Sequence, residues 1–128
     1  MRLLLDTNAI IWWDSKSSKL STKAHAALRD TSNEVFISIA SAWEMQIKAQ
    51  IGKLTQHKRW QDVIREQLRV NGFQLLRPEL RHVEVLDRLP FHHKDPFDRL
   101  LIAQAIDEGL TLVTSDAKFS AYPVSLLW

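Results

Sequence analysis

The chain has 128 residues, with 17 Lys and Arg, 15 Asp and Glu, and a formal net charge of +2. Its length suits one domain over residues 1–128, and a hydrophobic content of 45% is typical of a globular protein. Because the chain has no cysteine, thiol catalysis and thiolate metal sites are excluded, and any metal must bind oxygen or imidazole ligands. No apolar run is long enough for a signal peptide or a membrane span, so we expect a cytoplasmic protein without a membrane partner.

The first half of the chain alternates short apolar runs with amphipathic stretches. The third helix is expected to bury Trp43, Ile47 and Ile51, which are spaced four residues apart. The predicted elements, in chain order, are a strand over 2–5, a helix over 7–13, a helix over 20–29, a strand over 35–38 and a helix that ends near Gly52.

The second half of the chain continues the alternation. Its predicted elements are a helix over 58–70, a strand over 73–76, a helix over 78–89, a helix over 96–109, a strand over 112–114 and a short edge strand over 124–127. In the helix over 78–89, Leu80, Val83 and Leu86 or Asp87 recur around the turn. The alternation predicts an α/β fold with a mainly parallel sheet of four or five strands.

Two acidic residues follow predicted strands directly. Asp6 comes after the first strand, and Asp116 comes just after the fourth. Ligands of open α/β sheets bind outside the carboxyl ends of the strands, so both acids lie where chemistry is expected. Each acid also fits a simpler role, as the N-cap of the segment that follows the strand.

Glu44 and Asp98 lie near the starts of two predicted helices. Glu44 completes the pattern Ser41-x-x-Glu, which is typical of a capping box, but it also neighbours the expected buried stripe and would need a partner there. Asp98 lies in the first turn after Asp95 and Pro96, where Asp95 suits an N-cap. Asp98 therefore faces either a cleft or the helix macrodipole.

The four acids together would make a metal site if the fold brings them to one place. Two carboxylates about 4 Å apart repel by roughly 4 kcal/mol at an effective dielectric constant of 20. Protons or a cation must offset that repulsion, and Mg²⁺ and Mn²⁺ prefer oxygen ligands. Such an ion makes bound water more nucleophilic and neutralises a phosphoryl oxygen, as hydrolysis of a phosphodiester requires.

Four segments follow one another in the chain: Leu-Leu-Leu-Asp-Thr-Asn, Ser-x-x-Glu, Asp-Pro-Phe-Asp-Arg-Leu-Leu-Ile-Ala-Gln-Ala and Thr-Ser-Asp-x-x-Phe. In this order they resemble the PIN-domain family, and within it the VapC-type toxins of type II toxin–antitoxin systems. The resemblance implies a three-layer α/β/α sandwich and a Mg²⁺- or Mn²⁺-dependent endoribonuclease that hydrolyses RNA through a metal-activated water. It implies catalytic and metal-binding roles for Asp6, Glu44, Asp98 and Asp116.

The resemblance also implies supporting residues and partners. Asn8, Thr114 and Ser115 match small polar positions that hold the acids or the hydrated metal. Many family members have a further acid where this chain has Lys118, so we expect one firmly bound ion. The implied partners are an RNA substrate, a cognate antitoxin that contacts Trp12 or Trp13, and a second copy in a homodimer.

Arg99 and His93 are candidates for contact with the substrate. Arg99 would alternatively form a rim ion pair with Asp95 or another acid, and His92 and His93 would alternatively be exposed loop residues. A PIN-like binding module without catalysis, for RNA or protein, remains an alternative function. A receiver-like Mg²⁺-binding signalling domain fits less well, because Asp6-Thr7-Asn8 supplies only one acid beside the first strand.

Overall fold

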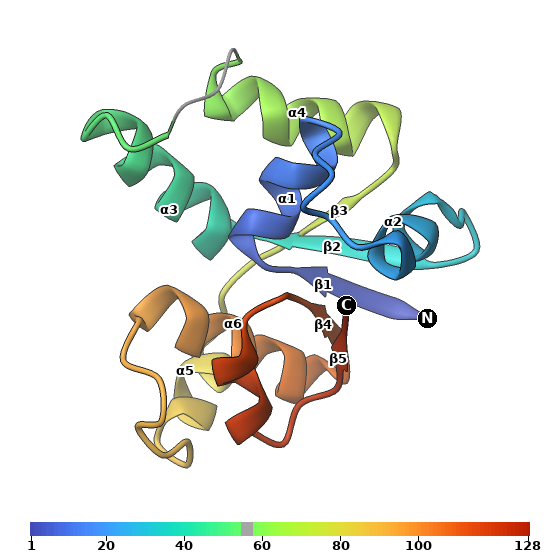
Figure 1. The fold of residues 1–128 in the computed structure, drawn as a ribbon. Coiled ribbons are helices and arrows are strands. Elements are labelled where there is room, and N and C mark those ends of the chain that lie inside the picture. Colours follow the sequence, from blue (N-terminus) through green and yellow to red (C-terminus); the bar gives the residue numbers. More distant parts are fainter. Residues whose placement is uncertain (55–57) are drawn as a thin grey trace.

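The computed structural model describes residues 1–54 and 58–128, and its centre is one parallel sheet (Figure 1). The strand order is β3-β2-β1-β4-β5, and every neighbouring pair is parallel. This arrangement confirms the predicted α/β fold with five strands. The strands are β1 (Arg2–Leu5), β2 (Glu34–Ser38), β3 (Gln74–Leu76), β4 (Thr111–Val113) and β5 (Leu126–Leu127).

Helices cover both faces of the sheet, which makes the three layers (Figure 1). Side chains alternate along β1, so that Leu3 and Leu5 join one hydrophobic core while Leu4 joins the other. One face is covered by α1 (Thr7–Asp14), α2 (Thr22–Arg29), α3 (Ile39–Gln50) and α4 (Trp60–Val70). The other is covered by α5 (Leu80–Leu86), α6 (Pro96–Glu108) and the 3₁₀ helix η1 (Ala117–Ala121).

The buried face of α3 differs from the prediction. Trp43 is 61% exposed and Ile51 57% exposed, whereas Ala40 and Met45 are buried. Helix α3 begins at Ile39 directly after β2, with Ser38 as its N-cap. That start turns a face with small residues toward the protein, and small side chains permit close packing, so the large Trp43 remains outside.

The residues that recur along α5 likewise do not mark its buried face. Leu80 is 75% exposed and Val83 is 49% exposed, while His82 and Val85 are buried. The Nδ1 atom of His82 accepts the backbone N–H of Glu79 in a capping box, and this contact sets the helix so that His82 faces inward. The predicted inner face of α2 was correct, because Leu20, Ala24, Ala27 and Leu28 are all buried.

The strand order creates a crevice between the ends of β1 and β4. The chain runs from β1 to β2 and β3 on one side of the sheet, and then crosses to β4 and β5 on the other. A reversal of this kind is where ligands of open α/β sheets bind. Leu5 pairs with Val113, and the Asp6 amide donates to the Val113 carbonyl at 3.1 Å. Asp6 therefore lies beside the segment from Thr114 to Asp116.

Among the described residues, no helix combines the length and the hydropathy that crossing a membrane requires.

Candidate active site

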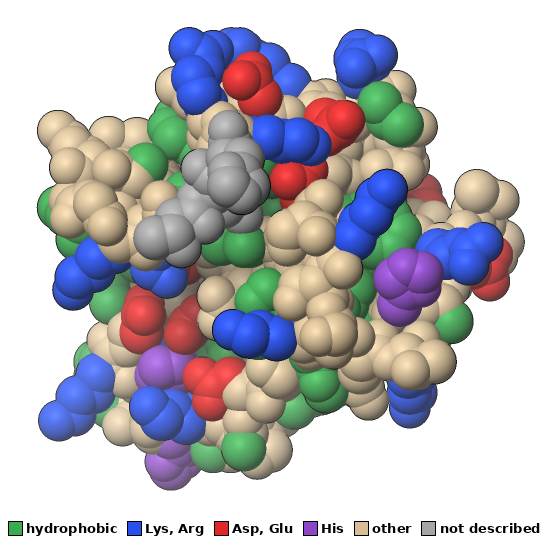
Figure 2. Space-filling model, turned by 45° about the horizontal axis from the view of Figure 1, so that its top comes forward, with side chains coloured by type: hydrophobic (Ala, Val, Ile, Leu, Met, Phe, Trp, Pro, Cys, Tyr) green, Lys and Arg blue, Asp and Glu red, His purple; other side chains and the backbone are tan. Residues whose placement is uncertain are grey.

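A cavity of about 190 Å³ lies at the carboxyl ends of β1 and β4. It is lined by Asp6, Thr7, Asn8, Glu44, Lys48, Asp95, Asp98, Ser115, Asp116 and Phe119. The structure thus brings the four predicted acids together, although they come from α1, α3, α6 and η1 or the residues that cap them. Asn8 and Ser115 are exposed at its rim. Figure 2 shows acidic side chains gathered beside a histidine on one face of the molecule, with Lys and Arg side chains around them.

Thr114 lies next to two of the acids. Its Oγ1 accepts the Asp116 amide at 3.1 Å, and its hydroxyl lowers the pKa of Asp6. Asp6 Oδ1 also accepts the Ala9 amide at 2.7 Å, and Asp116 Oδ1 accepts the Lys118 amide at 2.9 Å. Both acids therefore cap the segment that follows them and still line the cavity. The two roles that the sequence left open are compatible, because capping by Oδ1 leaves Oδ2 available.

Glu44 is buried in the interior of α3, so its interpretation as part of a capping box was wrong. The helix is capped by Ser38, and Ser41 forms no reciprocal bond with Glu44. The Glu44 carboxylate instead accepts the Thr7 hydroxyl and pairs with Lys48 Nζ at 3.2 Å. Sequence reasoning missed Thr7 and Lys48, although the four-residue spacing between Glu44 and Lys48 on a helix was a usable signal.

Asp98 faces the cavity next to a buried histidine. Asp95 caps α6 by accepting the Phe97 amide at 2.8 Å, as its sequence position predicted. Asp98 Oδ2 lies 2.7 Å from His93 Nε2, and the same nitrogen is 3.8 Å from Asp116 Oδ2. The interpretation of His93 as an exposed loop residue was therefore wrong, whereas His92 is exposed.

Arg99 does not reach the cavity. Its guanidinium is buried and donates to the Pro90 carbonyl at 2.9 Å and to the Leu89 carbonyl at 3.3 Å. The guanidinium carbon, Cζ, also lies 4.1 Å from the centre of the Phe91 ring. The expected phosphate contact and the alternative ion pair with Asp95 both disagree with this geometry. Arg99 instead holds the loop that precedes α6, because an arginine carries enough donors to satisfy several carbonyls.

The acids of the cavity are electrostatically unfavourable without a cation. Burial raises the pKa of Asp6 to about 6. Hydrogen bonds from Thr114 and Ala9 lower this pKa, whereas the charges of Glu44 and Asp116 raise it further. Burial also raises the pKa of Asp98 to about 6, with repulsion from Asp95 adding to it and His93 opposing it. A set of carboxylate oxygens whose charges are disfavoured by burial, and whose repulsion Lys48 and His93 relieve only in part, fits a hard divalent cation such as Mg²⁺ or Mn²⁺.

Comparison with known proteins gives the family. The model of the PIN domain matches residues 3–124. The chain belongs to the PIN-domain family. It is similar to Ribonuclease VapC22 of Mycobacterium tuberculosis (strain ATCC 25618 / H37Rv), with 28% identity over 127 residues that cover 94% of this chain and 91% of that protein.

Solved structures share the PIN-domain fold of this chain. The crystal structure of VapBC2 from Rickettsia felis, bound to a DNA fragment from their promoter, matches with a TM-score of 0.75 and 20% identity over 99% of this chain and 98% of that one. DNA-bound VapBC from Salmonella typhimurium matches with a TM-score of 0.72 and 16% identity over 99% of this chain and 97% of that one. These likenesses confirm the predicted α/β/α architecture.

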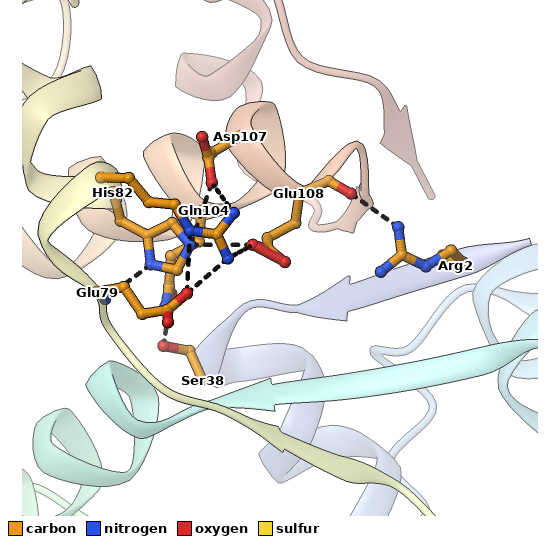
Figure 3. Close-up of polar contacts among 8 residues, drawn as sticks. Arg2, Ser38, Glu79, His82, Gln104, Asp107 and Glu108 are labelled. Atoms are coloured by element: carbon orange, nitrogen blue, oxygen red, sulfur yellow. Dashed lines mark hydrogen bonds and ion pairs between the residues drawn. The ribbon is translucent and has the colours of Figure 1, made fainter.

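A second group of potential ligands, Glu79, His82 and Glu108, lies away from the cavity (Figure 3). His82 Nδ1 accepts the Glu79 amide at 2.9 Å, so the proton of the neutral ring must be on Nε2, which lies 3.3 Å from Glu108 Oε2. A protonated nitrogen has no lone pair for a metal. Arg81 pairs with Glu79, Asp107 and Glu108. This group is therefore a structural network that joins α5 to the end of α6.

A larger groove of about 980 Å³ is lined by residues of α1, α2, α4 and β2 and shares no lining residue with the acidic cavity. Trp13 lines it and donates its indole N–H to Gln67 at 2.8 Å. Trp12 packs against Trp128 with ring centres 5.7 Å apart. Both Trp12 and Trp13 are half-buried, because adjacent residues of a helix point in different directions and cannot share one face.

Proposed function

We propose that this chain is a divalent-metal-dependent endoribonuclease that acts as the toxin of a toxin–antitoxin pair. One observation carries the proposal: Asp6, Glu44, Asp98 and Asp116, far apart in the chain, line one cavity at the switch point of a PIN-domain sheet. The naming of a 28%-identical relative as a ribonuclease supports the same activity.

The residues of the site have two roles: some would bind the ion, and others position the residues that bind it. Asp6, Asp98 and Asp116 would bind the ion directly or through water, and Glu44 would complete its shell or orient the attacking water. When bound, the ion supplies a more nucleophilic water and neutralises charge on a phosphoryl oxygen. Thr114 would position Asp116 by accepting its amide and would favour the charged form of Asp6 through its hydroxyl. We propose one firmly bound ion, since Lys118 stands where a further acid would be needed.

Exposed lysines next to the acids would hold the phosphates of the RNA. Lys48 lines the cavity, while Lys94 and Lys118 are exposed within two residues of Asp95 and Asp116. Each would neutralise one phosphate of a substrate strand that runs across the cavity. Asn8 and Ser115, also exposed at the rim, would donate or accept hydrogen bonds with the hydrated ion or the substrate.

The proposed protein partners are a cognate antitoxin and a second copy of the toxin. Similar chains are found in complexes named VapBC, including two that were solved bound to DNA. The groove lined by Trp13 combines apolar residues such as Leu28 and Phe73 with both basic and acidic residues. It would accept a partner segment with apolar and charged side chains.

Cleavage of a mixed cellular RNA preparation tests the activity. The purified chain should cut RNA with Mg²⁺ or Mn²⁺ and stop when EDTA is added. Asp98→Asn should reduce cleavage at least 100-fold while circular dichroism shows an intact fold. Asp62→Asn is the matched control, because Asp62 is an exposed acid paired with Arg59 away from the cavity. Binding of RNA without cleavage at any metal concentration would instead support the binding module without catalysis.

A further inference from the structure

His93 directs a ring nitrogen into the group of acids at the cavity. Its Nε2 lies 2.7 Å from Asp98 Oδ2 and 3.8 Å from Asp116 Oδ2. These three atoms lie within 4.8 Å of one another. In an octahedral shell with bonds of about 2.1 Å, neighbouring ligand atoms are about 3 Å apart. The observed separations therefore bracket the spacing that one small divalent ion requires.

The position of the His93 ring is fixed by its surroundings. The backbone N–H of His93 donates to the Tyr122 hydroxyl at 2.8 Å, and that hydroxyl donates to the Pro90 carbonyl at 2.8 Å. The ring packs edge-on against Phe119, with ring centres 5.7 Å apart. The side chain is 9% exposed. A ring held in this way cannot turn to solvent when an ion enters, so its nitrogen stays among the ligands.

His93 differs from His82 in the property that decides metal binding. A bond from the Glu79 backbone amide occupies the Nδ1 lone pair of His82, which fixes the proton on Nε2. In the metal-free protein, the 2.7 Å contact between His93 Nε2 and Asp98 Oδ2 is a hydrogen bond, so a proton lies between these two atoms. No described residue donates a hydrogen bond to Nδ1 of His93, so the ring can carry its proton on Nδ1 when an ion replaces the proton at Nε2. His82 cannot make this change, because its Nδ1 accepts the Glu79 amide.

We propose that His93 is a direct nitrogen ligand of the catalytic ion, which makes this a mixed carboxylate–imidazole site rather than one of oxygen ligands alone. The inference rests on the metal site of the proposed function and adds a consequence for metal choice. Mg²⁺ takes oxygen ligands, whereas imidazole suits first-row transition-metal ions. This chain therefore favours a transition-metal ion over Mg²⁺ more strongly than its four acids alone would.

Pulsed electron paramagnetic resonance of the Mn²⁺-loaded protein tests the proposal without reference to cleavage. Mn²⁺ is the probe, and electron spin echo modulation from nitrogen reports an imidazole bound to it. Protein labelled with ¹⁵N at histidine alone assigns the signal. The test variant is His93→Gln, whose side-chain amide can still donate to Asp98. His92→Ala is the matched control, because His92 is the exposed neighbour.

The wild type and His92→Ala should show the histidine nitrogen signal, and His93→Gln should lack it. Titration should show Mn²⁺ affinity reduced on the order of 10-fold or more in His93→Gln, with Mg²⁺ affinity changed less. Mn²⁺ bound without histidine nitrogen coupling would overturn the proposal and leave the proposed nuclease function intact. Failure of the wild type to bind Mn²⁺ would overturn both this ligand assignment and the metal dependence of the proposed function.

Discussion

Replacing Asp6 with Asn should stabilise the metal-free protein at neutral and alkaline pH, although Asp6 belongs to the candidate active site. Asp6 is buried beside Glu44 and Asp116, and its charged form is disfavoured there. An asparagine has nearly the same shape and keeps an oxygen that can accept the Ala9 amide. The substitution therefore removes the charge and retains the cap.

The pKa of Asp6 gives the size of the effect. The pKa rises from 3.8 in the unfolded chain to about 6 in the fold. A tenfold change in proton affinity is worth about 1.4 kcal/mol, so ionised Asp6 costs the folded state up to about 3 kcal/mol. The folded state holds this proton more tightly, so the free energy of unfolding of the wild type falls as pH rises from about 4 through 6. We expect Asp6→Asn to gain about 1–3 kcal/mol at pH 8 and almost nothing below pH 4.

Urea denaturation with EDTA, between pH 4 and pH 8, measures this difference. Asp62→Asn again serves as the control, and its difference from the wild type should be small and change little with pH. Saturating Mg²⁺ at 100 times its dissociation constant should add about 2.7 kcal/mol to the wild type and much less to Asp6→Asn. If Asp6→Asn were the less stable protein at pH 8 in EDTA, the explanation that burial and the neighbouring acids disfavour the Asp6 charge would be refuted.

Three further predictions concern residues outside the acid group, and urea denaturation checks each of them. Arg99→Met should lower the free energy of unfolding by about 2–4 kcal/mol, because several buried carbonyls lose their donor. The Mn²⁺ affinity of the folded protein should stay within about twofold. Unchanged stability together with lost RNA binding would show that Arg99 contacts the substrate instead. Trp43→Ala should cost less than about 1 kcal/mol and Leu101→Ala about 2–5 kcal/mol, since Trp43 is largely exposed and Leu101 fully buried; equal costs would place Trp43 in the core. Ser38→Ala should cost about 1–3 kcal/mol, because the buried Gln104 amide loses the hydroxyl that donates to it at 2.6 Å and α3 loses its N-cap bond to the Ala40 amide; a neutral effect would show that neither bond contributes to stability.

The positions of the strands along the chain were predictable because strands of a parallel sheet are buried on both faces and form short apolar runs. Leu3, Leu4 and Leu5 form such a run, with side chains in both cores. Helix faces were less predictable. In α3 and α5, apolar residues occur on the exposed side as well, so periodicity alone cannot decide between two stripes. The N-caps at Ser38 and Glu79, which set the phase of each helix, decide it instead.

The acids of the site were predictable for a different reason. Asp6 directly follows β1 and Asp116 comes shortly after the adjacent β4, so the sheet brings them together once its order is known. The contacts of Thr7 with Glu44 and of His93 with Asp98 depend on how α1, α3 and α6 pack, which leaves no local pattern in the sequence. Arg99 was misassigned because charge suggests a solvent-facing role, while loop carbonyls in need of donors are invisible in the chain.

The location of a bound ion tests the central claim most directly. Crystals of the protein soaked in Mn²⁺ and measured at the manganese absorption edge should give one strong anomalous peak, within bonding distance of oxygens from Asp6, Asp98 and Asp116. A peak at Glu79 and Glu108 instead, or no peak in the cavity at saturating Mn²⁺, would contradict the assignment of these acids to a metal centre.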